Sequence, residues 1–443
     1  MTSFFHTYDL RGVYPDEIGE KEALEVGKAF GTFTEAEKVL VGCDGREHGE
    51  KIMEAFIEGL VSTGTDVLDA GMAPTPVIKF GQYENNLEAS VTVTASHNPP
   101  EYTGFKFCKD NALSMSREGG MSDIQDVYEN KEFEKGEGEV REINVLDDYI
   151  SELKDIFGSM DLKVAVNCGN GVTGILIEEL FDAFDSELTL INGEVDGSFP
   201  NHLPDPTNEE AQKALESAMS DEDIGIMLDG DGDRAGFILP EYGHISEDEV
   251  LSLFSEEALQ KSRGKIVYDL MASKLVSETI KDNGGQAVES RVGHTFISEA
   301  IHSDEDVVFA GELSGHFYFP AWDFPWDDGL FASALMMKML SEDKLEERLA
   351  SYTEYPVSPE LRIDCPESSK KEVIGKIGQE YSNYQITTKD GVKIHFENGW
   401  ALVRPSSTEP KMSVRCEADT EEDLEEILEE IENSVRSAIS EAS

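Results

Sequence analysis

The sequence has no paired cysteines, few basic residues and no long apolar stretch. Its five cysteines stand singly, without a CxxC pair. An odd, dispersed set favours free thiols in a reducing cytoplasm over a disulfide framework. No run of 18 or more apolar residues occurs, and the opening MTSFFHTYDLRG lacks the basic and apolar regions of a signal peptide. These absences predict a cytoplasmic protein without a membrane-spanning helix.

Acidic residues dominate the charge. The 92 Asp and Glu residues stand against 36 Lys and Arg residues, which gives a formal net charge of −56. Disorder does not explain this charge, because 39 % of the residues are hydrophobic. The segment TEEDLEEILEEIENSVRSAI has a helical period, and its apolar face comprises Leu424, Ile427, Leu428, Ile431 and Val435. We infer a folded protein whose acidic shell repels nucleic acid and anionic membranes, as in proteins from salt-saturated cytoplasms.

Three segments share one plan of strand, glycine-bearing loop, helix and strand. They cover residues 38–71, 162–193 and 264–293, and each has the length of a βαβ-like unit. The pattern indicates divergent α/β repeats. Near the C-terminus, VKIHFENGWALVRPSS and PKMSVRCEA predict adjacent strands ahead of the acidic helix, hence a smaller α+β domain. Polar, turn-rich stretches place the predicted domains at 1–147, 148–244, 245–352 and 353–443.

The stretch VTVTASHNPP ends a strand-like alternation with Ser96 and His97. Ser, Asn and two prolines are ordinary turn residues. The alternative is that Ser96 is a nucleophile displayed at a strand end.

The stretch GIMLDGDGDRAGF leads from an apolar strand to Asp229, Asp231 and Asp233. Alternate residues of an extended segment point the same way, so three carboxylates converge and repel one another unless a cation lies among them. Oxygen ligands suit Mg²⁺ or Ca²⁺. An EF-hand is excluded, since Arg234 and Pro240 occupy the positions that require Gly and Glu. The alternative is a solvated acidic turn.

Two further loops predict ligand contacts. In GELSGH, alternate residues suit hydroxyl recognition, and an ordinary polar hairpin is the alternative; they are Glu312, Ser314 and His316. In LVRPSSTEP, a guanidinium and three hydroxyls suit a phosphate cradle, and an ordinary turn is the alternative; they are Arg404, Ser406, Ser407 and Thr408. Together the loops predict a sugar phosphate as ligand.

Five motifs in this order resemble the α-D-phosphohexomutase family, of the phosphoglucomutase/phosphomannomutase group. They are YDLRG, TASHNPP, DGDGDR, GELSGH and RPSSTEP, and they span nearly the whole chain. The resemblance implies three related α/β domains with mixed sheets and a smaller C-terminal α+β domain around a central active-site cleft. With the acidic shell, it also suggests a halophilic archaeal member.

The motifs depart from the family pattern at a few positions. Leu10 replaces a common Ile, Ala235 a common acidic residue, and Ser407 a common Asn or Gly. GELSGH is closest to the GEMSGH of enzymes that act on mannose and glucose phosphates. Glucosamine mutases usually carry Gln at the position of Leu313, so phosphoglucosamine mutase is the alternative.

The resemblance also implies a mechanism. A phosphorylated Ser96 passes its phosphoryl group to the substrate, a hexose 1,6-bisphosphate forms and turns round, and the other phosphate returns to Ser96. Mg²⁺ binds Ser96 together with Asp229, Asp231 and Asp233.

The remaining roles follow from the same resemblance. Lys106 is the stronger acid/base candidate and His97 the weaker, while Arg11 and Arg234 offset negative charge. Arg291 contacts the sugar phosphate, and Arg46 supports the serine loop or takes part in catalysis.

Two other classes of function stay open. One is a metal-dependent sugar-phosphate phosphatase, which would release inorganic phosphate. The other is a non-catalytic sensor, which would be expected to lack Ser96 or the aspartates. We expect a monomer or small homo-oligomer that binds small sugar phosphates.

Overall fold

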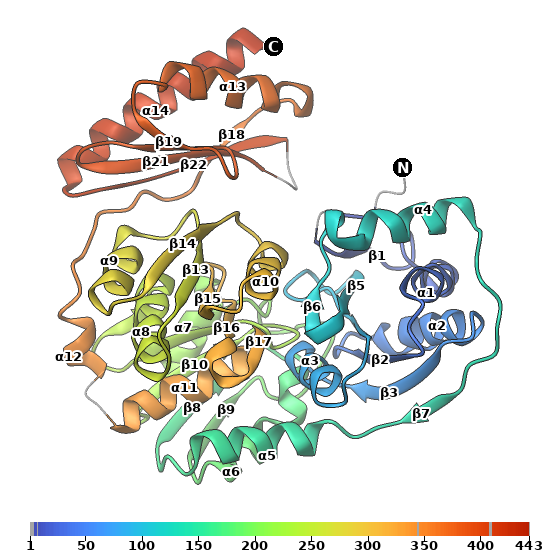
Figure 1. Cartoon of the computed structure of the whole chain (residues 1–443). Helices are drawn as coiled ribbons and strands as arrows, with labels where there is room; N and C mark the ends of the chain where they lie inside the picture. The colour runs from blue at the N-terminus through green and yellow to red at the C-terminus, as the bar shows by residue number, and fades with distance from the viewer. Residues whose placement is uncertain (1–3, 7, 343–344, 407–409, 443) are drawn as a thin grey trace.

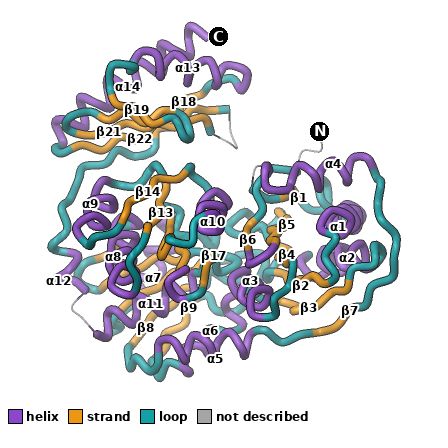
Figure 2. Tube along the Cα trace, viewed as in Figure 1, coloured by secondary structure: helices purple, strands orange, loops and turns teal. Residues whose placement is uncertain are grey.

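The computed structural model describes residues 4–6, 8–342, 345–406 and 410–442, in which the strands form four sheets flanked by helices (Figures 1 and 2). Each sheet, together with the helices assigned to it below, is called a unit. Among the described residues, every helix is too short or too polar to cross a membrane.

The first unit contains a mixed sheet in the order β1-β5-β4-β2-β3-β7, with β6 paired to β5. Its strands are β1 (Leu10–Val13), β2 (Lys38–Cys43), β3 (Asp66–Met72), β4 (Ala89–Val93), β5 (Tyr102–Lys109), β6 (Leu113–Ser114) and β7 (Val140–Glu142). Its helices are α1 (Glu20–Thr34), α2 (Gly49–Val61), α3 (Thr75–Glu84) and α4 (Ser122–Asn130).

The second unit has the order β12-β11-β10-β8-β9. Its strands are β8 (Lys163–Asn167), β9 (Glu187–Ile191), β10 (Ile224–Leu228), β11 (Ala235–Leu239) and β12 (Gly243–Ile245), and its helices are α5 (Leu146–Phe157), α6 (Ile177–Ala183) and α7 (Glu209–Ala218).

The third unit has the order β14-β13-β15-β16-β17. Its strands are β13 (Lys265–Asp269), β14 (Gln286–Ser290), β15 (Val307–Gly311), β16 (Phe317–Phe319) and β17 (Phe324–Asp327). Its helices are α8 (Glu247–Lys261), α9 (Lys274–Asp282), α10 (His294–Ser303), α11 (Gly329–Glu342) and α12 (Leu345–Leu349).

The three sheets share one topology, which confirms the repeats. Each contains a run of three parallel strands followed by an antiparallel one: β3-β2-β4-β5, β9-β8-β10-β11 and β14-β13-β15-β16. The central strands β4, β10 and β15 are buried along their whole length, as expected when helices cover both faces of a sheet. The mixed α/β fold is therefore confirmed.

The fourth unit is an antiparallel sheet in the order β18-β22-β21-β20-β19. Its elements are β18 (Leu361–Asp364), β19 (Gln385–Thr387), β20 (Val392–His395), β21 (Gly399–Pro405), β22 (Lys411–Ala418), α13 (Lys370–Glu380) and α14 (Glu421–Ala442). The predicted apolar face of α14 packs on the core of this unit, with Leu428 partly buried. This unit (red in Figure 1) lies beside the third, next to α9 and β14. The domain boundaries stay a prediction.

Candidate active site

Three equivalent loops carry the predicted motifs. In each of the first three units a loop joins the last parallel strand to the antiparallel strand beside it: β4 to β5, β10 to β11 and β15 to β16. Ser96 lies in the first loop, the three aspartates lie in the second, and residues 312–316 of GELSGH form the third. The loops meet: the Ser96 Oγ donates to Asp229 Oδ2 at 2.8 Å, and Arg234 forms an isolated bridge with His316. The fold repeat thus brings distant motifs into one site.

Ser96 has an unusual backbone conformation. Its φ of 50° lies in the left-handed region, which is rare for residues other than glycine. The Ser96 N–H donates to the Thr94 hydroxyl at 2.8 Å, and its Oγ lies 3.2 Å from His97 Nδ1. Such strain persists only where the surroundings impose it, and it is common at functional sites. The structure therefore favours a displayed nucleophile over an ordinary turn.

Arg46 stabilises the loop that carries Ser96 (the serine loop) through hydrogen bonds to its backbone. Its side chain is buried, and its guanidinium donates to the backbone carbonyls of Ser96, Asn98, Pro99 and Tyr102 at 2.7–3.1 Å. Through these hydrogen bonds the guanidinium group holds the loop in one conformation. Of the two roles left open, loop support is the one this geometry favours.

The aspartate loop approaches the serine loop closely. A Cβ on Gly230 would lie 2.5 Å from the Ser96 carbonyl oxygen, so only glycine fits there. Asp231 Oδ2 accepts from the Thr75 hydroxyl at 2.6 Å and from Lys106 Nζ at 2.7 Å. Lys106 also donates to Asp233 at 2.5 Å. Charge on the carboxylates is thus offset in part by an ammonium group of the first unit.

The three aspartates are fully buried, and one oxygen of each lies within 4.8 Å of the others. Burial, reinforced by the neighbouring Asp231 and Asp233, raises the pKa of Asp229 to about 7. Burial alone would lower the pKa of Lys106, but the three carboxylates outweigh it and raise the pKa above its usual value. Lys106 is therefore an ammonium group at neutral pH.

The donor set fits a hard divalent cation. Among the described residues, the buried Asp231 Oδ1 has no hydrogen-bond partner, although burying an unpaired carboxylate oxygen is costly. Three converging carboxylates beside a serine hydroxyl match the oxygen ligands that Mg²⁺ prefers. A solvated acidic turn does not fit, because these carboxylates have no contact with solvent.

Glu312, Ser314 and His316 form a compact hydrogen-bonded group. The Ser314 hydroxyl donates to Glu312 Oε1 at 2.5 Å, and His316 Nδ1 lies 2.7 Å from the same oxygen. Burial alone would raise the pKa of Glu312, but His316 and Ser314 hold it at about 2. Burial alone would lower the pKa of His316, but Asp233 and Glu312 raise it to about 10. At neutral pH, Glu312 is therefore a carboxylate and His316 an imidazolium.

Arg11, Arg234 and His97 surround Ser96. Arg11 donates to Asp9 and Asn98, and Arg234 Nε donates to Asp229 Oδ2 at 3.1 Å. The Arg234 charge, with burial, lowers the pKa of His97 to about 2. His97 is therefore neutral at physiological pH and suited to accepting a hydrogen bond.

A cavity of about 480 Å³ opens in front of Ser96. Arg11, His97, Lys106 and His316 line it with Ser96. Six further residues line it that the sequence motifs did not single out: His6, Tyr8, Asp9, Asn98, Tyr102 and His294. The first five lie in or near the motifs YDLRG and TASHNPP. Asp205, which pairs with Arg234 at 3.4 Å, has no signal in the sequence.

Two predicted arginines lie apart from this cavity. Arg404 Nε is 3.2 Å from Asp390 Oδ2, and the Arg291 guanidinium stacks 3.5 Å from the Phe296 ring. Neither lines the Ser96 cavity. The Ser406 N–H donates to the Lys411 carbonyl at 2.9 Å. Ser407 and Thr408 lie outside the described residues.

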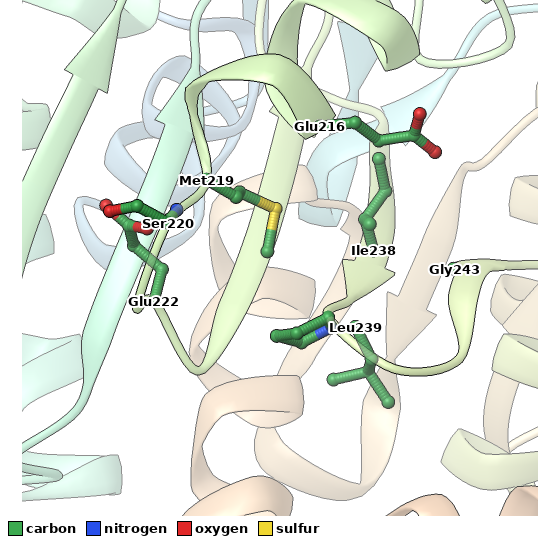
Figure 3. Close-up of a pocket in the computed structure, with 8 residues that line it drawn as sticks. Glu216, Met219, Ser220, Glu222, Ile238, Leu239 and Gly243 are labelled. Atoms are coloured by element: carbon green, nitrogen blue, oxygen red, sulfur yellow. Dashed lines mark hydrogen bonds between the residues drawn. The ribbon is translucent and has the colours of Figure 1, made fainter.

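Another cavity, of about 340 Å³, lies beside α7 and β11 (Figure 3). Met219, Ile238 and Leu239 line it together with Glu216 and Glu222. It shares no lining residue with the Ser96 cavity, and the Glu222 carboxylate is bound to the Thr189 hydroxyl at 2.7 Å. Among its described lining residues there is no Lys, Arg or His side chain to bind a phosphate, so it is not the active-site candidate.

Comparison with known proteins agrees with this geometry. Models of phosphoglucomutase/phosphomannomutase α/β/α domains I, II and III match residues 2–135, 147–243 and 246–355, and the C-terminal domain model matches residues 360–434. The chain is 34 % identical to a phosphomannomutase/phosphoglucomutase of Pseudomonas aeruginosa, over 95 % of this chain and 92 % of that one. It is 36 % identical to a phosphomannomutase of Methanocaldococcus jannaschii, over 94 % of each chain.

A solved structure of a phosphoglucomutase/phosphomannomutase family protein from Burkholderia thailandensis superimposes with a TM-score of 0.91 at 29 % identity, over 99 % of this chain and 98 % of that one. Four matched domains in order, and relatives above 30 % identity along nearly the whole length, leave one assignment: the chain belongs to the phosphoglucomutase/phosphomannomutase family.

Proposed function

We propose that this enzyme is a phosphohexomutase that interconverts hexose 6-phosphates and hexose 1-phosphates of mannose, glucose or both. The observation that carries the proposal is the strained Ser96, whose Oγ contacts Asp229 in a cavity that also holds Lys106. In a member of this family, a nucleophile in that setting supports phosphoryl transfer through Ser96.

The chemistry consists of two transfers. In the first, the P–Oγ bond of phosphorylated Ser96 breaks and a P–O bond forms to the free sugar hydroxyl, whose proton is released. The product is a hexose 1,6-bisphosphate and a free Ser96 hydroxyl. In the second, the bisphosphate has turned round, the P–O bond between the sugar and its other phosphoryl group breaks, and a P–O bond forms to Ser96 Oγ. The Ser96 hydroxyl proton is released, and the departing sugar oxygen takes up a proton to give the hexose monophosphate product. No phosphate is gained or lost overall.

The residues around Ser96 supply charge and protons. Lys106, held as an ammonium group in the same cavity, is proposed to protonate the departing Ser96 Oγ, and the neutral His97 is proposed to accept a hydrogen bond and orient the hydroxyl. Arg11 and Arg234 offset the charge of the phosphoryl group.

Ser96 and the three aspartates are proposed to hold Mg²⁺. When bound, the ion would neutralise charge on the transferring phosphoryl group.

Substrate recognition is assigned to the other loops. Glu312, Ser314 and His316 are proposed to bind sugar hydroxyls. The phosphate distant from Ser96 is assigned to basic and hydroxyl side chains, namely Arg291, Arg404, Ser406, Ser407 and Thr408. A hexose 1,6-bisphosphate serves as intermediate and activator.

The acidic composition supports a setting. With a net charge of −56, the protein is proposed to be a salt-adapted cytoplasmic enzyme, of halophilic archaeal type. We propose a monomer or small homo-oligomer, without nucleic acid or membrane partners.

A substrate panel tests the function. The 1-phosphates of glucose, mannose and glucosamine are each incubated with Mg²⁺ and a trace of glucose 1,6-bisphosphate, and the 6-phosphates and inorganic phosphate are measured. We expect turnover of the mannose or glucose substrate without phosphate release. Preferred turnover of the glucosamine substrate would make the protein a phosphoglucosamine mutase, and phosphate release matching substrate loss would make it a phosphatase.

A further inference from the structure

A groove of about 490 Å³ lies between the third and fourth units, away from Ser96. Helix α9 and strand β14 form one wall, and β20, β21 and the segment before β20 form the other. Figure 1 shows the fourth sheet over α9 and β14. The groove shares no lining residue with the Ser96 cavity. We call it the lysine groove, after the residues described next.

The charge of the lysine groove is opposite to that of the molecule. Its lining contains Lys274, Lys281, Lys389 and Lys393, and Glu289 is the one carboxylate among the described lining residues. The whole chain, by contrast, has 92 acidic and 36 basic residues. Two of these lysines come from the third unit and two from the fourth, so ammonium groups of both units face one space. Ammonium groups that face one space repel one another, and an anion that enters the space relieves this repulsion.

Two of the four ammonium groups are already paired. Lys393 is 4 % exposed and donates to Glu289 Oε1 at 2.7 Å, and its Nζ lies 4.3 Å from the centre of the Trp400 ring. Lys274 pairs with Asp419 at the edge of the groove. These contacts hold two ammonium groups in place, the buried one of Lys393 and the partly exposed one of Lys274.

The other two ammonium groups have no carboxylate partner within the described part of the chain. Lys389 Nζ donates to the backbone carbonyl of Glu289 at 2.6 Å, and the Lys281 ammonium group makes no ion pair or hydrogen bond with the described residues. Both are exposed, one on each wall. Among so many acidic residues, two lysines on opposite walls that have no carboxylate partner in the described part of the chain leave positive charge for an external anion.

We propose that the lysine groove is a second anion site, which takes a small molecule bearing a phosphate group and joins the third and fourth units. Lys281 and Lys389 bind the phosphate oxygens as charged donors, since lysine binds phosphate as a point charge. Lys393 and Trp400, both nearly buried, line the groove beside them, and the Lys393 charge is offset by Glu289. Asp390, which follows Lys389, pairs with Arg404, so the site adjoins the proposed phosphate loop.

Titration calorimetry tests the site on the intact protein at one fixed KCl concentration. The probes are inorganic phosphate and glycerol 3-phosphate. Tighter binding of inorganic phosphate would indicate a site for the free anion, and tighter binding of glycerol 3-phosphate a site for an organic phosphate. The variants are Lys281→Gln with Lys389→Gln, and Lys281→Gln alone, which leaves the neighbour of Asp390 unchanged. A matched control, Lys51→Gln with Lys371→Gln, removes the same charge from exposed lysines outside the groove.

For wild type we expect a binding step that the double variant weakens at least tenfold, the single variant weakens less, and the control leaves unchanged. The tighter probe should also raise the melting temperature of wild type and control more than that of the double variant, because a ligand that binds only the folded state stabilises it. Equal isotherms for wild type and the double variant would overturn the proposal, as would equal weakening in the control. Neither outcome depends on mutase activity, so failure of this site is distinguishable from failure of the proposed function.

Discussion

The assignment of the metal site can be tested most directly at Asp231. Its Oδ2 is bound by Thr75 and Lys106, while its buried Oδ1 is unpaired among the described residues. Asp231→Asn removes charge from the three-carboxylate site, so we expect Mg²⁺ affinity to fall at least tenfold and kcat with it. The measurement is a Mg²⁺ titration of activity, together with direct Mn²⁺ binding.

The control for this variant is Asp182→Asn, at an exposed position on α6. It changes the net charge equally and should bind metal as wild type does. If Asp231→Asn kept the wild-type metal titration, the aspartates would not be the metal site.

At this scale, local pattern predicted Ser96 and the aspartates, because strand alternation and glycine spacing are visible in sequence. The left-handed φ of Ser96 and the placement of the Lys106 ammonium were not predictable from it. Thr75 and Asp205 were missed because their roles depend on contacts between segments distant in the chain.

Helix α3 of the first unit is joined to β17 of the third by a buried ion pair, Lys79 with Asp327. Lys79 Nζ also donates to the Ser114 hydroxyl at 3.2 Å, and Asp327 accepts from Tyr318 at 3.3 Å. Lys79→Met would leave the Asp327 charge buried and unpaired. We expect a loss of about 3–5 kcal/mol in the free energy of unfolding.

Urea unfolding of the two single variants and of the double variant Lys79→Met with Asp327→Asn measures this coupling. The double variant should lose less stability than the sum of the single losses, since it leaves no lone charge. Additive losses would show that the pair does not stabilise the contact between units.

Strand β9 is joined to the turn before β10 through Glu222, at the cavity of Figure 3. Hydrogen bonds from the Ser220 N–H and then the Thr189 hydroxyl lower the pKa of Glu222 from 4.5 to about 2. A carboxylate with a lowered folded-state pKa stabilises the fold above its unfolded pKa, and the stabilisation disappears as pH falls through the folded value.

Glu222→Gln should therefore unfold at lower urea than wild type at pH 7, and the gap should narrow from about pH 4.5 towards pH 2. Glu216→Gln, an exposed neighbour in the same cavity, serves as the control and should show no such change. A gap that stayed constant with pH would mean that the Glu222 charge does not stabilise this turn.

Elements with strong periodicity were predictable from local pattern, whereas the convergence of their loops was inferred from the chemistry of the motifs and from the family resemblance. The three βαβ units and the face of α14 follow from apolar spacing, which is local. The meeting of the loops β4–β5, β10–β11 and β15–β16 depends on how the units pack against one another. For instance, the ring of Phe80 on α3 packs against the ring of Phe324 on β17, with 5.8 Å between the ring centres. No pattern within either segment specifies that contact.

For the whole molecule, the net charge of −56 predicts a need for salt. The Debye length is about 10 Å at 0.1 M salt and about 3 Å at 1 M, so molar KCl screens repulsion within the acidic shell. It also weakens the field that opposes an approaching anionic substrate. We expect both the melting temperature and kcat/KM to rise with KCl up to molar concentrations.

A non-ionic osmolyte at matched osmolality is the control, and it should not raise kcat/KM because it screens no charge. Full activity and an unchanged melting temperature in salt-free buffer with millimolar Mg²⁺ would assign the acidic surface another cause.

The central claim is that the phosphoryl group passes through Ser96. Intact-mass spectrometry after incubation with glucose 1,6-bisphosphate tests it on wild type, on Ser96→Ala and on the control Ser62→Ala, a helix-end serine outside the Ser96 cavity. Wild type and Ser62→Ala should gain one phosphate, whereas Ser96→Ala should gain none and lose several orders of magnitude in mutase activity with an unchanged melting curve. A phosphate-sized addition on Ser96→Ala, or turnover near that of wild type, would contradict the account.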